Sequence, residues 1–138
     1  MAKILAFDFG MAHIGVAVGD TVLKTATPLS ALKAKDGVPD RRALDRLMGE
    51  SRPASLAVGL PLNMDGSEQE LTRGARGFAG RLRRDYRLRV DFVDERLSTA
   101  EAKGALFERG GFRALSRDKG RVDCAAAAVI LEQYFSES

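Results

Sequence analysis

The sequence predicts an α/β domain built on a mixed five-stranded sheet with helices on both faces. Three strand-like segments separated by turn residues open the chain, which favours a meander of hairpins. Strand-like and helical segments then alternate, a pattern typical of parallel strands joined by crossover helices. The chain has 138 residues, a length suited to one hydrophobic core rather than two. We therefore expect a single domain spanning residues 1–138.

The expected strands are short apolar runs bounded by turn residues. The first run, residues 4–7, is continuously apolar, as in strands that are buried on both faces, and Asp8 closes it. An unpaired charge at the tip of a buried strand is costly, so Asp8 needs a cation or strong hydrogen-bond donors nearby. The strands are predicted at residues 4–7, 15–18, 21–29, 55–60 and 88–93.

Two helices are predicted in the first two-thirds of the chain. Asp40 is placed to cap a helix that ends near Gly49, and the preceding segment, residues 31–39, has the composition of a loop. Residues 67–70 fit a capping box that opens a second helix. Glycines at positions 74, 77 and 80 weaken this helix relative to alanine, and their spacing would allow close packing against the sheet.

The last third of the chain predicts two more helices and a loop. A second capping box at residues 98–101, with Ser98 as the cap, opens a short helix that runs to Leu106. Residues 112–120 are polar and basic without apolar periodicity, which indicates a loop. Residues 121–135 are apolar almost all round, so we expect a helix packed deeply against the sheet.

The composition excludes several classes of protein. No run of about 18 apolar residues exists to span a membrane, and the N-terminus lacks the pattern of a signal peptide. One cysteine and one histidine exclude a Cys/His zinc site. The cysteine, Cys124, lies in an alanine-rich run, where a buried structural thiol is expected rather than a nucleophile. A cytoplasmic location is expected.

Basic residues concentrate in two groups, although the formal net charge is only +3. Either group fits a solvated surface, but two groups flanking one site would favour a polyanionic ligand such as nucleic acid. The first group comprises Arg81, Arg83, Arg84, Arg87 and Arg89, and the second comprises Arg109, Arg113, Arg117, Lys119 and Arg121.

Carboxylates occur where this topology would bring the ends of elements together. Asp8 ends the first strand, Asp94 and Glu95 end the last, and Asp123 lies in the opening turn of the final helix. Asp8 alone could be a turn residue, and Asp123 alone could simply favour the start of a helix. Gathered together, carboxylates repel unless a cation neutralises them, and hard oxygen ligands suit Mg²⁺ or Mn²⁺. Two such ions support phosphodiester hydrolysis. These residues alone leave the choice between Asp94 and Glu95 open.

Four motifs, in order along essentially the whole chain, resemble the YqgF/RuvX family of RNase H-like nucleases. Members are described as pre-16S rRNA processing enzymes or as relatives of Holliday-junction resolvases. The motifs are Asp8-Phe9-Gly10 with residues 14–17, residues 58–63 with Asp65-Gly66, residues 94–99, and Val122-Asp123.

The resemblance implies an RNase H-like fold and divalent-metal phosphodiester hydrolysis, with Asp8, Glu95 and Asp123 as catalytic metal ligands. The implied substrate is the 5′ side of the small-subunit rRNA precursor. A Holliday-junction resolvase is the alternative, and it would require a homodimer because resolution needs two active sites; monomer and homodimer both stay open. A non-catalytic nucleic-acid-binding module fits less well, since binding alone needs no clustered negative charge. A small ATP-using phosphotransferase would need a second domain.

Several residues are candidates for substrate contacts. Where the family commonly has Thr followed by basic or polar residues, this chain has Met11-Ala12-His13, and His13 either contacts a phosphate or is an ordinary surface residue. Arg96 either grips a phosphate or pairs with the acidic cluster, and Asn63 either positions substrate or closes a turn. The basic candidates are Arg113, Arg117, Lys119 and Arg121.

Overall fold

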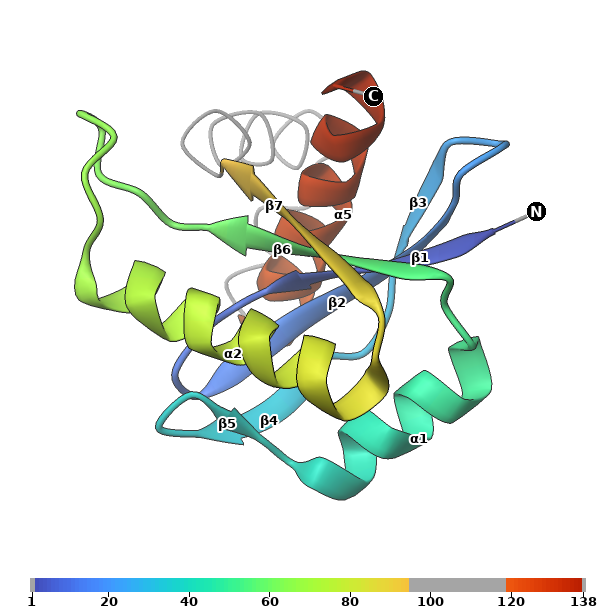
Figure 1. Cartoon of the computed structure of the whole chain (residues 1–138), viewed down its shortest axis with the longest axis horizontal. Coiled ribbons are helices and arrows are strands. Elements are labelled where there is room, and N and C mark those ends of the chain that lie inside the picture. The colour runs from blue at the N-terminus through green and yellow to red at the C-terminus, as the bar shows by residue number, and fades with distance from the viewer. Residues whose placement is uncertain (1, 95–118, 138) are drawn as a thin grey trace.

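The computed structural model describes residues 2–94 and 119–137, with side chains in the latter range described from 125 to 136. The strands form one sheet in the order β5-β4-β2-β1-β6-β7, and β3 also pairs with β2 (Figure 1). The strands are β1 (Lys3–Asp8), β2 (His13–Asp20), β3 (Thr25–Pro28), β4 (Leu32–Lys35), β5 (Val38–Pro39), β6 (Ser55–Leu60) and β7 (Arg89–Asp94). The described helices are α1 (Arg41–Ser51), α2 (Glu70–Tyr86) and α5 (Lys119–Glu137).

The sheet is mixed, as predicted. Strand β1 pairs antiparallel with β2 and parallel with β6, and β6 pairs parallel with β7. Strands β1, β6 and β7 therefore end at the same edge of the sheet, which we call the carboxyl edge. This edge is where the sequence predicted that acidic residues would gather.

The predicted count of five strands was wrong, because residues 31–39 form a hairpin instead of a loop. Strand β4 pairs with β5 across a two-residue turn in which Asp36 and Gly37 have φ angles of 51° and 80°. Positive φ at both central residues is the geometry that Asp-Gly favours in tight hairpins. The alternating lysines of β4 obscured its strand character.

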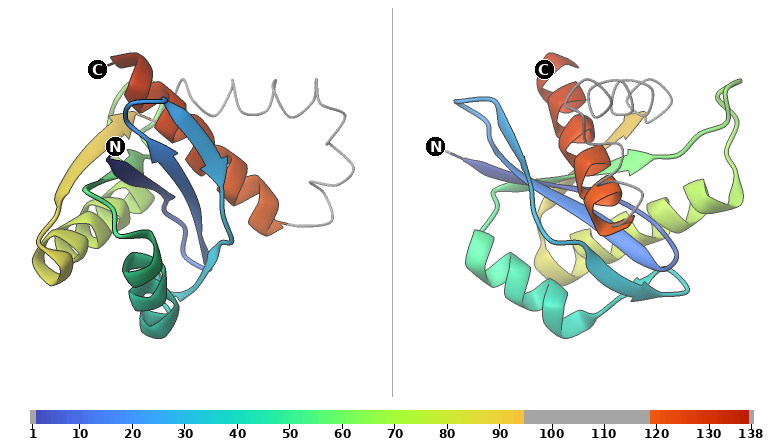
Figure 2. Two further views of the ribbon diagram at one scale, coloured as in Figure 1. Left: turned by 90° about the vertical axis from the view of Figure 1, so that its right-hand side faces the viewer. Right: turned by 180° about the vertical axis from the view of Figure 1, so that it is seen from behind.

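Helices cover both faces of the sheet, which confirms the prediction. Helices α1 and α2 lie on one face and α5 crosses the other (Figure 2). Along β1 the side chains alternate between these two cores: Leu5 and Phe7 pack with α1 and α2, whereas Ile4 and Ala6 pack with α5. Each of these four side chains is fully buried.

Helix α1 begins at the predicted cap. The side chain of Asp40 accepts a 3.1 Å hydrogen bond from the backbone N–H of Arg42, and Leu44 and Met48 are buried. The helix continues two residues beyond Gly49 and stops at Arg52, whose φ of 45° is left-handed.

Helix α2 begins later than the capping box at residues 67–70 implied, so that prediction was wrong. The cap is Gln69, and its backbone N–H donates a 3.1 Å hydrogen bond to the hydroxyl of Thr72. Ser67 instead donates to the carboxylate of Asp65 within the preceding loop. A local Asp–Ser turn therefore took the hydroxyl that the sequence pattern had assigned to the helix.

Only one glycine of α2 makes the close approach predicted for it. A Cβ at Gly74 would lie 2.7 Å from the ring of Phe9, whereas a Cβ at Gly77 or Gly80 would meet nothing within 4 Å. The close packing at Gly74 brings α2 against the residue that follows Asp8.

Helix α5 is longer than predicted and begins at Lys119, within the segment expected to be a loop. Its residues Ala127, Ile130 and Leu131 are buried against the sheet, as the apolar pattern required. The backbone of Cys124 lies within α5. The predicted helix at 98–106 and the rest of the predicted loop lie outside the described residues. In the described ranges, the helices are too short or too polar to cross a bilayer.

Candidate active site

Asp8 is the last residue of β1 and lies at the carboxyl edge of the sheet. It pairs with Gly15 of β2 and is half-buried. Because side chains alternate along a strand, Asp8 shares the α5 face with Ile4 and Ala6. The predicted position of this carboxylate, at the tip of a buried strand, is confirmed.

The end of β7 lies at the same edge as Asp8, since Phe7 of β1, Val58 of β6 and Phe92 of β7 form one row across the sheet. Phe92 faces α2, with the guanidinium of Arg76 5.2 Å from its ring centroid. By alternation Asp94 follows Phe92 to the α2 face, away from the face of Asp8. Glu95, the neighbouring candidate, lies outside the described residues.

The opposite face of β7 carries Asp91 and Val93. The Tyr134 hydroxyl on α5 donates a 3.0 Å hydrogen bond to Oδ2 of Asp91, and Val93 is buried in the core beneath α5. Burial, followed by this bond to Asp91, raises the pKa of Tyr134. Helix α5 is therefore attached to β7 on the face that carries Asp8.

Asp123 lies in α5, four residues before Ala127 and eight before Leu131, so the three positions share one row of the helix. Leu131 packs against Gly19, which pairs with Ile4 near the start of β1. From Leu131, the helix runs about 12 Å back to Asp123. Figures 1 and 2 show the N-terminal end of α5 over the half of the sheet where β1 ends. The backbone of Asp123 thus lies on the face of Asp8, displaced toward the carboxyl edge.

His13 and Asn63 both lie near this edge. His13 is the exposed first residue of β2 and pairs with Lys33 of β4. Asn63 closes the loop after β6: its backbone N–H donates to the carbonyl of Ser67 at 2.9 Å, and its amide donates to the Ser67 hydroxyl at 3.0 Å. The structure therefore shows the turn-closing role that the sequence allowed for Asn63.

The first basic group does not flank the carboxyl edge, and that expectation was wrong for its residues from 83 to 89. These residues lie at the end of α2 and the start of β7, about 17 Å along the strand from Asp94. Arg83 donates to the carbonyl of Val90 at 2.6 Å, and Arg89 pairs with Asp91 at 3.0 Å. Arg83 thus joins α2 to β7, and Arg89 pairs with a carboxylate of its own strand.

The second basic group is largely outside the description. Lys119 and Arg121 lie in the first turn of α5, on the side of the sheet that carries Asp8. Arg96, Arg109, Arg113 and Arg117 lie outside the described residues.

Within the described ranges, no group of three or more His, Cys, Asp or Glu residues is arranged to hold a metal. Two of the three predicted ligands, Glu95 and Asp123, have no described side chain.

Sequence reasoning named Arg81 in the first basic group but missed Arg73 and the hollow that the two arginines share. A hollow of about 670 Å³ lies on the α2 face, and Arg73 and Arg81 of α2 line it together with Phe9 and Met11. The Asp36-Gly37 dipeptide was the available signal, because the hairpin that it closes forms one wall.

Comparison with known proteins identifies relatives along the whole chain. Residues 2–137 match the RuvX family, whose description is Holliday junction resolvase. Proteins of Salmonella paratyphi B and Salmonella newport, each named "Putative pre-16S rRNA nuclease", are 54% identical over 134 residues. These matches cover 97% of this chain and 96% of each relative.

Solved structures with the same fold include two Holliday junction resolvases. Thermus thermophilus RuvC, in complex with a Holliday junction substrate, aligns with a TM-score of 0.59 and 20% identity over 99% of this chain and 95% of its own. The fowlpox virus Holliday junction resolvase aligns with a TM-score of 0.54 and 13% identity over 98% of both chains. These likenesses confirm the predicted RNase H-like fold. The family match and the 54% identity together show that the chain belongs to the RuvX family.

Proposed function

We propose that this chain is a single-domain, divalent-metal-dependent nuclease that processes the 5′ end of the 16S rRNA precursor in the cytoplasm. The observation that carries the proposal is that Asp8, at the carboxyl end of β1, shares a face of the sheet with the N-terminal part of α5, where Asp123 lies. The names of the Salmonella relatives support the reaction and the substrate.

Asp8, Glu95 and Asp123 are the proposed catalytic residues. The alternation along β7 favours Glu95 over Asp94, because Asp91 and Val93 face α5 whereas Asp94 follows Phe92 to the other face. Glu95 comes two positions after Val93 in the sequence. A carboxylate from each of β1, the end of β7 and α5 would thus serve one site.

The donors proposed for this site fit a hard divalent cation. They are carboxylate oxygens, which Mg²⁺ and Mn²⁺ prefer, and Asp8 follows four fully buried residues of β1 that restrict its position. When bound, such ions activate water and stabilise the leaving oxygen of a phosphodiester. The residues of the chain would hold the ions and orient the scissile phosphate between β1 and α5.

Contacts with the nucleic-acid backbone are proposed around the same edge. His13 is exposed at the start of β2, and Asn63 lies in a hydrogen-bonded loop after β6. The other proposed contacts are Arg96, Arg113, Arg117, Lys119 and Arg121. Neutralised phosphates release counterions, so binding through these residues should weaken as salt rises.

A Holliday-junction resolvase is the second candidate. The description of the family and the solved resolvases of the same fold favour it. Symmetrical cleavage of a junction needs two active sites, so this function requires a homodimer, whereas processing of precursor rRNA is possible for a monomer. The choice of substrate is therefore linked to the oligomeric state.

The test is cleavage of precursor rRNA and of a four-way DNA junction with Mg²⁺ or Mn²⁺. Asp8→Asn should lower cleavage about a hundredfold or more while leaving the circular dichroism spectrum unchanged. Glu95→Gln should act likewise, and Asp94→Asn is its matched control with little effect. Cleavage by Asp8→Asn at the rate of the unmodified protein would overturn the proposal. Cleavage of the junction alone would favour the resolvase.

A further inference from the structure

The hollow on the α2 face lies directly beside the proposed active site. Phe9 follows Asp8 in the sequence, and the two residues lie on opposite faces of the sheet: Asp8 shares the α5 face, and Phe9 packs in the core beneath α2. The ring centroids of Phe9 and Phe78 of α2 are 5.7 Å apart. The hollow therefore lies at the same carboxyl edge as Asp8, on the other face of the sheet.

Three apolar side chains, those of Phe9, Met11 and Leu71, contribute to the lining of the hollow. Phe9 is only 6% exposed, and the positions facing its ring are glycines: a Cβ at Gly37 or at Gly74 would lie 2.7 Å from it. Met11 is 51% exposed beside them. At about 670 Å³, the hollow is within the range of small-molecule sites. The exposed apolar side chain on which a flat ligand can pack is that of Met11, since the Phe9 ring is nearly buried against the two glycines.

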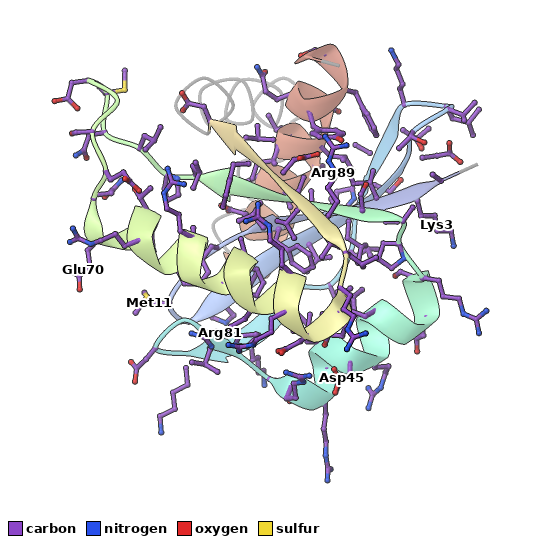
Figure 3. The ribbon with its side chains drawn as sticks, in the orientation of Figure 1. Lys3, Met11, Asp45, Glu70, Arg81 and Arg89 are labelled. Atoms are coloured by element: carbon purple, nitrogen blue, oxygen red, sulfur yellow. The ribbon has the colours of Figure 1, made fainter. Side chains whose placement is uncertain are left out.

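Charged groups of both signs surround this surface. Arg73 and Arg81 line it from α2, and neither guanidinium group has a hydrogen-bond or ion-pair partner within residues 2–94 and 125–136. They lie eight positions apart, about 12 Å along the helix, a separation that suits two different phosphates. The carboxylates lining the hollow belong to Asp36 and Glu70. Figure 3 shows Met11 between Glu70 and Arg81 along the length of α2.

This combination matches a nucleotide better than a simple anion. Two carboxylates beside two arginines would weaken the binding of a bare phosphate, since the four formal charges cancel. A nucleotide uses both signs: its phosphates take the guanidinium groups, its base packs on the apolar surface, and carboxylates accept hydrogen bonds from base N–H groups. The base must be unpaired to present its face to Met11.

We propose that the hollow binds an unpaired nucleotide of the substrate strand that flanks the cleavage point, with Arg73 and Arg81 contacting its phosphates. This proposal deepens the proposed nuclease function and rests on it for the identity of the ligand. It makes single-stranded character beside the cleaved bond a feature that the chain recognises. The site is formed by α2, the β1–β2 loop and the β4–β5 turn, and it needs no residue of the catalytic set.

The test measures binding by fluorescence anisotropy, using the Asp8→Asn protein so that ligands stay intact. The probes are an RNA duplex with blunt ends and the same duplex with a single-stranded tail at one end. The Asp8→Asn protein should bind the tailed probe about tenfold more tightly than the blunt duplex. Adding Arg73→Ala/Arg81→Ala to it should remove this preference. For the tailed probe, the slope of log K against log salt concentration should also become shallower by about 0.7 for each phosphate contact that is lost.

The matched control is Arg42→Ala/Arg46→Ala, which removes two exposed arginines of α1 at a distance from the hollow. It should keep the preference for the tailed probe. The proposal is overturned if the Arg73→Ala/Arg81→Ala protein still prefers the tail, or if the control loses the preference equally. Equal affinity of the Asp8→Asn protein for the two probes would also overturn it.

Cleavage assays separate this proposal from the nuclease proposal. In the protein with Asp8 intact, Arg73→Ala/Arg81→Ala should raise KM for tailed substrate and leave kcat close to that of the parent, because neither residue touches the reacting phosphate. An equal fall of kcat would overturn the flanking-site assignment. If the parent protein cleaves nothing but prefers the tailed probe, the hydrolase proposal fails and the nucleotide site stands.

Discussion

The Tyr134 hydroxyl and the Oδ2 atom of Asp91 lie 3.0 Å apart and join the last helix to β7. Nε of Arg89 contacts the other oxygen of the same carboxylate at 3.0 Å. The bond holds α5, which carries Asp123, against the strand that leads into Glu95. This side-chain contact adds to the apolar packing of Val93 beneath α5 in holding the helix against β7.

Tyr134→Phe should lower the free energy of unfolding by about 1 kcal/mol, because it removes one hydrogen bond without leaving a cavity. Urea denaturation followed by circular dichroism measures this change. Ser136→Ala is the matched control on α5, since that hydroxyl donates only to the carbonyl of Gln133 in the same helix; its effect should stay within about 0.5 kcal/mol. Equal midpoints for Tyr134→Phe and the unmodified protein would contradict the role of this bond.

The two tyrosines of the chain should resist ionisation in alkali. Burial, followed by hydrogen bonding to Asp45, raises the pKa of Tyr86, and burial with bonding to Asp91 raises that of Tyr134. A raised pKa means that the folded state favours the neutral phenol. The contribution of each tyrosine to the stability of the fold is therefore complete below about pH 10, and it is lost as the pH rises through the pKa in the folded state. Phenolate absorbance should stay low at about pH 10, where free tyrosine is half ionised. Half-ionisation of both side chains at that pH in the folded protein would refute this prediction.

Gly74→Ala and Gly77→Ala should have opposite effects although both lie in α2. A Cβ at Gly74 meets the Phe9 ring at 2.7 Å, so the substitution should destabilise by about 1–3 kcal/mol. A Cβ at Gly77 meets nothing within 4 Å, and alanine there should stabilise by up to about 1 kcal/mol through helix propensity. Thermal unfolding of the two variants tests the pair. Stabilisation by both would show that α2 does not approach Phe9 closely.

Thr72→Val should be strongly destabilising at nearly constant volume. Thr72 is fully buried, and its hydroxyl accepts a bond from the Gln69 N–H and donates to the carbonyl of Pro61. Valine leaves both backbone groups without this partner, at a cost of about 1–3 kcal/mol. Thr72→Ser keeps the hydroxyl and should lose distinctly less stability. A higher denaturant midpoint for Thr72→Val than for Thr72→Ser would contradict this prediction.

The sequence predicted the central strands well because burial on both faces leaves a plain signal. The runs at residues 4–7 and 56–60 are continuously apolar, and both belong to central strands. The β4–β5 hairpin was missed because edge strands can be largely polar, and β4 alternates its two lysines with Leu32 and Ala34. The start of α2 was misplaced because Ser67 bonds to Asp65 in the preceding loop. Gln69 is the cap instead, and the side chains of Gln69 and Thr72 both donate to the carbonyl of Pro61.

For the candidate site, the sequence predicted the position of Asp8, because this residue directly follows a buried strand. Asp8 follows a buried strand, so its place at the carboxyl edge could be inferred from the order of elements. The sequence could not separate Asp94 from Glu95, because it does not show which face of β7 meets α5. Phe92 and the Tyr134–Asp91 bond show that face within β7, and Glu95 stays a proposal. The sequence also could not show that β7 begins at Arg89 and ends at Asp94. These two charges therefore lie at opposite ends of the strand.

Strand β7 stands at the end of the strand order, and no other described strand pairs with its outer side. An open edge of this kind is a template on which a second chain can add during synthesis and aggregate. Arg89, Asp91 and Asp94 place charge along β7, and docking a foreign strand would force these groups out of water. The charged side chains of β7 thus disfavour the addition of another copy of the chain to this edge of the sheet.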